Sequence, residues 1–296
     1  MIVKYCNVNC QMNHWPKHKK VCKQRAAELH DEALFKDPPA KEDCPICFLP
    51  MPAKLISCIM LPPATISSVP IHDFAEANEE LAGKATEVYY PCCGKSICRG
   101  CEYSFVESGN EETCPFCKSD RMSKTDAENV EDLMKRVEAN DAFSIYVLGS
   151  YYYHGDLGLQ QDWARAMELW KQAADLGSSK AHCQLGISCS EYEKEGDSKK
   201  AEFHYEAAAM AGDEVVRLNL GCMEAQSGNM GRAVKHWTIA ASAGNYTAMH
   251  YLLIAFNQSV ASRATIDSSL RAYNNSCAEM RSDAREAFMG MFMVNN

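Results

Sequence analysis

The chain has 296 residues, a formal net charge of −9 and a sequence pI of about 5.5. Its length allows one to three domains, and its 47% hydrophobic and 23% charged residues exclude a fibrous or largely disordered chain. The acidic balance disfavours nucleic acid as a partner, because phosphate backbones attract basic surfaces.

Cysteine is the residue that says most about this chain. There are 16 cysteines, and twelve of them lie within the first 117 residues. The N-terminus lacks the apolar run of a secretory signal, and the most apolar stretch, residues 53–71, is interrupted by prolines, so we expect no membrane span. We therefore expect a cytoplasmic or nuclear protein with reduced thiols, and zinc binding is favoured over disulfides.

Residues 1–30 hold the first cysteine pattern. Its spacing is C-x3-C-x7-H-x3-C, formed by Cys6, Cys10, His18 and Cys22. His18 and Cys22 are four residues apart and share one face of a helical turn, which suits a common metal ion. With Gln11 and Trp15 the pattern resembles the C-terminal half of a MYND finger, a family that uses eight ligands for two zinc ions. Two interpretations stay open: a finger whose other half precedes Met1, or four ligands that gather on one zinc ion.

Residues 40–120 carry a second and denser set of cysteines between two predicted linkers, residues 36–41 and 118–125. Three C-x-x-C pairs and one adjacent pair provide eight thiols, which are Cys44, Cys47, Cys92, Cys93, Cys98, Cys101, Cys114 and Cys117. A C-x-x-C turn presents two thiolates at a spacing that suits tetrahedral zinc, so eight thiols predict two ions. Structural zinc supplies the folding energy that a module too small for a large core lacks.

The order of these cysteines resembles a RING finger of the all-cysteine type, in which the ligand pairs interleave. The resemblance implies one site from Cys44, Cys47, Cys98 and Cys101, and a second from Cys92, Cys93, Cys114 and Cys117. The sequence departs from the family at two points: the loop between Cys47 and Cys92 is long, and Lys95 stands where many members have a histidine ligand. Cys58 or His72 from the long loop therefore remain alternatives for the second site.

RING fingers usually act as ubiquitin ligases that hold a ubiquitin-conjugating enzyme and have no nucleophile of their own. The family's contact positions correspond here to Ile46, Phe105, Pro115 and Lys118. The resemblance implies that Ile46 and Phe105 form an apolar docking groove, and that Lys118 reaches toward ubiquitin. The alternative is that both apolar side chains only pack the finger.

From residue 126 to the C-terminus the sequence predicts helices that repeat. Leu-Gly recurs at Leu148, Leu185 and Leu220, and an aromatic-x-x-Ala-Ala-x-x-Gly segment begins at Trp170, Tyr205 and Trp237. Periods in the thirties with small residues at fixed places are typical of a helical-hairpin solenoid. We expect helices near residues 142–154 and 162–176 in the first unit, helix starts at Asp162 and Asp197, and a C-terminal cap from Tyr246 onward.

The first unit resembles a Sel-1-like repeat, a relative of the tetratricopeptide repeat, through the markers at Leu148, Gly149, Trp170 and Gly177. Families of this kind are protein-interaction scaffolds, so the resemblance implies a protein partner on the concave face.

Together these features predict small zinc-stabilised α+β finger domains (1–30 and 40–120) followed by an all-α solenoid of helical hairpins (126–296). The expected cofactor is zinc, with two ions in residues 40–120 and a third if the finger in residues 1–30 also binds metal. The predicted function is that of a RING-type ubiquitin ligase whose repeats recruit a protein client. The alternative is a non-enzymatic adaptor in which both parts bind proteins.

Overall fold

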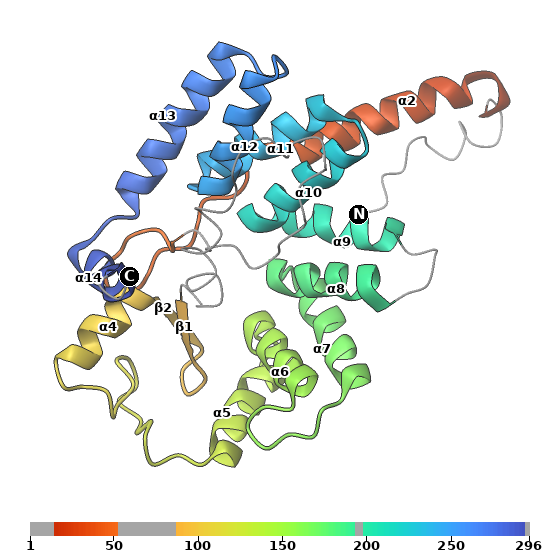
Figure 1. Cartoon of the computed structure of the whole chain (residues 1–296). Helices are drawn as coiled ribbons and strands as arrows, with labels where there is room; N and C mark the ends of the chain where they lie inside the picture. Colours follow the sequence, from red (N-terminus) through yellow and green to blue (C-terminus); the bar gives the residue numbers. More distant parts are fainter. Residues whose placement is uncertain (1–14, 53–86, 193–197, 294–296) are drawn as a thin grey trace.

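The computed structural model describes residues 15–52, 87–192 and 198–293 (Figure 1). Along the chain they form a long first helix, a small cysteine-rich finger and a series of paired helices. The fold class expected from the sequence, a finger of mixed structure followed by an all-helical solenoid, is confirmed. None of the described helices is both long and apolar enough to cross a membrane.

The first helix, α2 (Trp15–Leu34), ends against the helical array. Arg217, whose side chain is buried, donates to the Leu34 carbonyl and so satisfies a backbone group at the end of the helix. One turn earlier, Asp31 pairs with Arg232. Just after the helix, the Phe35 ring lies 4.7 Å from the His236 ring, tilted by 56°. The C-terminal end of α2 is therefore fixed by polar and aromatic contacts with helices far away in the sequence.

The finger is a two-stranded hairpin followed by a short helix. Strands β1 (Glu87–Tyr90) and β2 (Lys95–Cys98) are antiparallel, with Glu87 opposite Cys98, and helix α4 (Arg99–Glu107) follows directly. The buried cluster of the described finger consists of Tyr90, Ile97 and four cysteines. This apolar core is small for an independent unit, so the sulfur atoms must contribute through a bound metal rather than through burial alone.

The helical array begins at α5 (Asp126–Glu138), whose start is a capping box between Thr125 and Glu128. Three helical hairpins follow. The two helices of each hairpin contact each other more extensively than they contact the neighbouring hairpins. The pairs are α6 (Ala142–His154) with α7 (Trp163–Asp175), α8 (Ser179–Tyr192) with α9 (Ser198–Met210), and α10 (Glu214–Gln226) with α11 (Met230–Ser242). The chain continues as α12 (Tyr246–Asn257), α13 (Arg263–Glu279) and α14 (Asp283–Met293).

The helices of the first repeat lie where the sequence predicts them, although α7 covers Trp163–Asp175 and the predicted end residues 162 and 176 are its caps. Helix α6 covers Ala142–His154, and Asp162 caps α7 by accepting a hydrogen bond from the Arg165 backbone N–H at 2.9 Å. The other predicted helix start, Asp197, lies outside the described residues.

The repeat markers meet inside each pair. The Leu-Gly glycine of the first helix lies against the aromatic ring of the second helix, in the three couples Gly149 with Trp170, Gly186 with Tyr205, and Gly221 with Trp237. Trp170 and Trp237 are fully buried, and they belong to two separate apolar clusters of the array. A residue without a side chain is required because the ring occupies the space of a Cβ atom.

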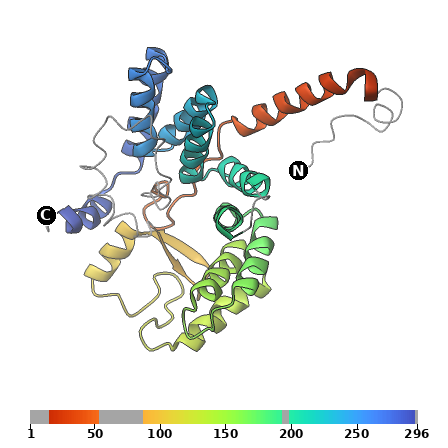
Figure 2. The ribbon, with the colours of Figure 1, turned by 45° about the vertical axis from the view of Figure 1, so that its right-hand side comes forward.

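The helices trace an arc, and the finger lies on its inner side (Figures 1 and 2). At the start of the arc the hairpin β1–β2 approaches α6, and at its end α14 packs against α4. The two ends of the array therefore both reach the finger.

Candidate metal centre

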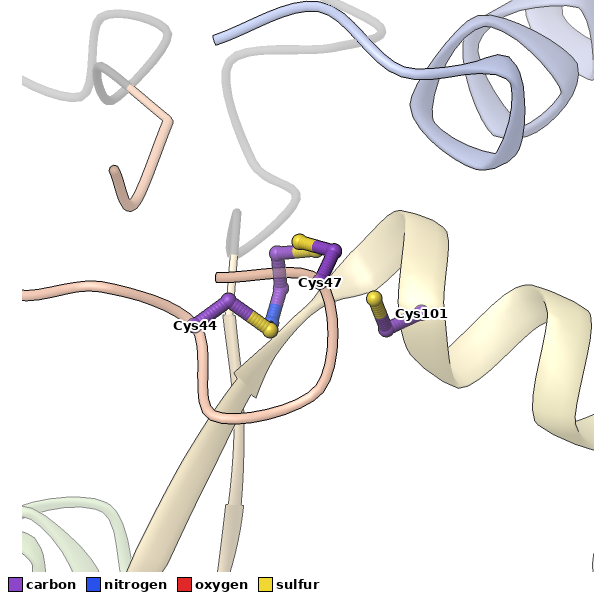
Figure 3. Close-up of side chains that lie close together, drawn as sticks. Cys44, Cys47 and Cys101 are labelled. Carbon is purple, nitrogen blue, oxygen red and sulfur yellow. The ribbon is translucent and has the colours of Figure 1, made fainter. Parts of the chain in front are cut away.

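The structure gathers the eight cysteines of the finger into two groups of four. Within each group the sulfur atoms all lie within 4.8 Å of one another. Cys44 and Cys47 come from the loop closed by the bridge between Asp43 and Pro50, whereas Cys98 and Cys101 come from β2 and α4. The thiols of Cys44, Cys47 and Cys101 lie close together in Figure 3. We call this group of four the first cluster. The second cluster consists of Cys92, Cys93, Cys114 and Cys117.

Two loops with the same backbone pattern deliver a C-x-x-C pair to each cluster. In the first loop the backbone N–H of Phe48 donates to the Cys44 carbonyl at 2.8 Å, and in the second the backbone N–H of Lys118 donates to the Cys114 carbonyl at 3.1 Å. Phe48 and Lys118 have positive φ angles, 55° and 60°, which turn the chain sharply after the second cysteine. Each loop is closed by one antiparallel bridge, so the sequence spacing translates directly into a fixed pair of thiols.

The backbone also prepares one thiol of each cluster for the thiolate form. Burial opposes the charge of Cys44, but backbone N–H groups of Cys47, Cys98 and Ile46 donate to its sulfur and lower its pKa to about 7. At Cys117 burial again opposes the charge, and hydrogen bonds from the Ser119 side chain and backbone lower the pKa to about 6. Because the thiolate is the metal ligand, these hydrogen bonds to sulfur from backbone N–H groups and the Ser119 hydroxyl favour metal binding.

The sulfur geometry fits zinc. Zinc–sulfur bonds of about 2.3 Å in a tetrahedron place neighbouring sulfur atoms about 3.8 Å apart. Sulfur–sulfur distances in the clusters include 3.9 Å for Cys47–Cys98, 3.7 Å for Cys93–Cys114 and 3.5 Å for Cys92–Cys117. All-sulfur tetrahedral sites are typical of structural zinc, so zinc is the cofactor of this finger.

The interleaved arrangement agrees with the ligand sets that the RING resemblance implied, and it includes both members of the adjacent pair Cys92 and Cys93. The alternatives Cys58 and His72 lie outside the described residues. Lys95 takes no place in either cluster, and its ammonium group lies 4.7 Å from the centre of the Phe116 ring.

The N-terminal ligand candidates are not placed by the structure. Cys6 and Cys10 lie outside the described residues, and so do the side chains of His18 and Cys22, although the backbone of both belongs to α2. Their zinc binding stays a prediction from the sequence.

The four residues predicted to contact a conjugating enzyme lie around the two cysteine loops and α4. Ile46 is 39% exposed, Lys118 is exposed, and Phe105 and Pro115 are half-buried. The Lys118 ammonium group lies 5.9 Å from the centre of the Phe105 ring. Whether Ile46 and Phe105 bind a conjugating enzyme or only pack the finger stays a prediction from the sequence. Among the described residues of the finger, the most exposed apolar side chain is Phe48, at 76%, which the sequence analysis did not single out.

A polar seam joins the finger to the first half of the array. The Tyr89 hydroxyl meets the Ser144 hydroxyl at 2.5 Å, and the Tyr89 ring lies edge-on to Phe143 at 4.8 Å. Glu87 forms an ion pair with Lys180 of α8. These contacts lie at the N-terminal ends of helices on the inner side of the arc. The expected place of a partner, the concave face, is thus partly taken by the chain's own finger.

One residue beside the first cluster, Arg285, could not be found by sequence reasoning. It comes from α14, and its guanidinium lies against the first cluster, with Nε 3.3 Å from the sulfur of Cys98. Neither its spacing from the cysteines nor its helical surroundings mark it in the sequence.

Comparison with protein families identifies the N-terminal segment and the helical repeats. The MYND finger family matches residues 1–22, and the Sel1 repeat family matches residues 142–178, 179–213 and 219–245. These matches confirm the MYND and Sel1 resemblances. They do not extend over residues 44–117, where the two cysteine clusters lie.

Two curated relatives are mammalian proteins called DAP3-binding cell death enhancer 1. The rat protein is 35% identical over 115 residues, which is 38% of this chain and 22% of the relative. The mouse protein is 39% identical over 97 residues, or 31% of this chain and 19% of the relative. The matched segment thus spans about a fifth of the length of these relatives.

Two solved structures with Sel1-type repeats are also similar. A Sel1 repeat protein from Oxalobacter formigenes is 25% identical with a TM-score of 0.40, over 44% of this chain and 38% of that protein. A protective antigen of uropathogenic Escherichia coli is 19% identical with a TM-score of 0.40, over 62% of this chain and 41% of the antigen. The family matches and the cysteine clusters together show that the chain consists of a MYND finger, a cysteine-rich zinc finger and three Sel1 repeats.

Proposed function

We propose that this chain is a protein-interaction adaptor, in which the Sel1 repeats bind a protein partner and the zinc finger stabilises the inner side of the array. The observation that carries the proposal is the run of three repeat pairs over residues 142–245. Repeat arrays of this kind present extended surfaces to proteins, since each unit contacts only its neighbours and the remaining faces stay accessible. We also propose that the first and second clusters hold one zinc ion each.

The outer face of the array offers a place for the partner. Because the finger contacts the inner side, the partner must use another surface of the repeats. Among the described residues of the repeats, Phe203 on α9 is the most exposed large apolar side chain, at 53%. Aromatic anchors of this kind often dominate the binding free energy of an interface.

The curated relatives suggest the first partner to test, because their name states that they bind DAP3. We expect saturable binding of purified DAP3 to the immobilised full chain, and a loss of about tenfold in affinity for Phe203→Ser, which corresponds to about 1.4 kcal/mol. Leu270→Ser is the matched control, since Leu270 is similarly exposed (43%) but lies outside the matched repeats. Absence of binding, or equal losses for both variants, would contradict this assignment.

A second function is supported by one observation on the finger: the cysteine pairs interleave as in RING fingers, and Lys118 lies beside Phe105 next to the second cysteine loop. This arrangement is compatible with a ubiquitin ligase that holds a conjugating enzyme. The test is an autoubiquitination assay with activating enzyme, ATP and several conjugating enzymes.

For a ligase, Ile46→Ala should abolish the ladder of ubiquitin products, whereas Phe48→Ala should leave it intact. Both side chains are exposed and lie on the same loop, but only Ile46 occupies a predicted contact position. If the wild type forms no ladder with any conjugating enzyme, the adaptor function stands alone.

A further inference from the structure

Arg285 of α14 contacts two sulfur atoms of the first cluster. Its Nε lies 3.3 Å from the sulfur of Cys98, and its Nη2 lies 3.5 Å from the sulfur of Cys47. The residue is 8% exposed although it carries a permanent charge. Burying a guanidinium is costly unless its charge is compensated and its N–H groups find acceptors.

The guanidinium has an acceptor for each of its five N–H groups. Besides the two sulfur atoms, it donates to three backbone carbonyls: Pro50 at 2.9 Å, Met280 at 2.7 Å and Leu49 at 3.4 Å. Leu49 and Pro50 belong to the first cysteine loop, whereas Met280 ends α13. One side chain therefore ties together the loop of Cys47, strand β2 and the last helices of the array.

The backbone of α14 is also shaped to this place. Gly100, between the ligands Cys98 and Cys101, lies so close to α14 that a Cβ atom there would be 2.7 Å from the backbone nitrogen and Cα of Arg285. Farther along, the rings of Tyr103 and Phe288 pack at 6.4 Å. The close approach of α4 and α14 is thus independent of the guanidinium contacts, and both place α14 on the first cluster.

The electrostatics explain why a cation belongs there. Four thiolates around one Zn²⁺ leave a net charge of −2, and N–H groups that donate to ligand sulfur atoms offset part of it. The two sulfur acceptors of Arg285 come from different segments, Cys47 and Cys98, and a shared ion holds such segments together. Without the ion, the thiols carry less negative charge and their segments are no longer held together, so less compensates the cost of burying Arg285.

We propose that Arg285 is a positioning residue that couples zinc binding at the first cluster to the docking of α14. In the loaded chain α14 closes the C-terminal end of the array onto the finger, and in the unloaded chain it is released. This inference rests on the proposed zinc binding by Cys44, Cys47, Cys98 and Cys101. Because coupling between two equilibria is reciprocal, docked α14 also retains the ion.

The test uses the full chain and two measurements. Amide hydrogen exchange, followed by mass spectrometry, compares zinc-loaded protein with protein treated with a strong chelator. We expect chelation to raise exchange in residues 283–293 by at least tenfold, while exchange in α10–α12 is unchanged. The second measurement is the rate at which a chelator removes zinc, followed with a coloured indicator after the metal content has been determined.

Arg285→Ala and Gly100→Ala should each accelerate zinc release by about tenfold or more, the usual effect of removing a hydrogen-bond partner of a metal ligand. Gly100→Ala keeps the guanidinium and displaces the helix, so the two variants separate charge from docking. Arg281→Ala is the matched control, since Arg281 is 75% exposed and pairs with Glu286 at the surface. It should behave as the wild type.

Exchange in α14 that is insensitive to zinc, or a wild-type release rate in Arg285→Ala, would overturn this inference alone. A wild-type chain that holds no zinc would overturn the proposed metal binding itself.

Discussion

Gly149→Ala tests the close helix approach on which each repeat depends. A Cβ atom at Gly149 would lie 2.7 Å from Cδ1 and Nε1 of Trp170, about 1 Å inside the usual contact distance. The Trp170 ring cannot simply retreat: it is 1% exposed, packs on Tyr153 at 5.3 Å and donates to the Tyr146 carbonyl at 3.3 Å. Overpacking of this kind costs about 1–3 kcal/mol.

The steric cost is opposed by the better helix propensity of alanine, which is worth up to about 1 kcal/mol. We therefore expect a net destabilisation of about 1–2 kcal/mol, or a decrease in melting temperature of about 2–8 °C for an array of this size. The assay is urea unfolding at constant free zinc, followed by tryptophan fluorescence.

The matched control is Gly231→Ala on α11. A Cβ atom at Gly231 has no neighbour within 4 Å, so only the propensity gain remains, and we expect stabilisation of up to about 1 kcal/mol. If Gly149→Ala is as stable as Gly231→Ala, the Leu-Gly marker does not report helix approach and the reasoning is refuted.

Three further predictions concern the metal and a buried histidine. Purified protein should hold two zinc ions in residues 44–117, and Cys98→Ser should lower the count by one, whereas Cys189→Ser, buried in α8, should not. Chelation should abolish amide protection in β1 and β2 but leave the circular dichroism of the helices nearly unchanged, because the array has its own apolar clusters. Loss of both the amide protection and the helical signal would contradict the separate stabilisation of finger and array. Burial lowers the pKa of His236 to about 3 in the folded chain, whereas a histidine in the unfolded chain has a pKa of about 6.5. As the pH decreases below about 6.5, the unfolded chain therefore binds a proton at His236 that the folded chain does not bind. The free energy of unfolding should then fall by about 1.4 kcal/mol per pH unit. His236→Gln should remove this part of the pH dependence of the free energy of unfolding between pH 7 and 5. If the free energies of unfolding of variant and wild type change with pH in parallel, His236 is not the group responsible.

The repeats are predictable from the sequence because each marker residue is required by the local backbone geometry. The left-handed turn at Gly177 (φ 89°) and the cap at Asp162 are set within a few residues, and a buried aromatic must recur once per helical pair. For the same reason the bounds of α6 were predicted to the residue. The C-terminal region has degraded markers, and nothing in its sequence indicates that α14 leaves the array and packs on α4.

The cysteine clusters were also predictable in part. Thiols at C-x-x-C spacing have few alternatives to a shared metal, and the hairpin places the adjacent pair Cys92 and Cys93 at a turn beside Cys114. The seam between finger and array was not predictable. Contacts such as Tyr89–Ser144 and Glu87–Lys180 join residues of ordinary composition across 55 and 93 positions, and many other pairs would satisfy the same side chains.

Each cluster meets a guanidinium from one end of the helical array. Arg136 of α5 donates to the carbonyl of Cys92 at 3.3 Å, at the second cluster, whereas Arg285 of α14 reaches the first cluster. The array itself folds by apolar burial, and the finger depends on metal, so these two arginines link units that are stabilised by different forces. Loss of zinc from one cluster should therefore loosen one end of the arc and leave the other attached. In the adaptor that we propose, loss of zinc would change the accessibility of the inner face without unfolding the repeats.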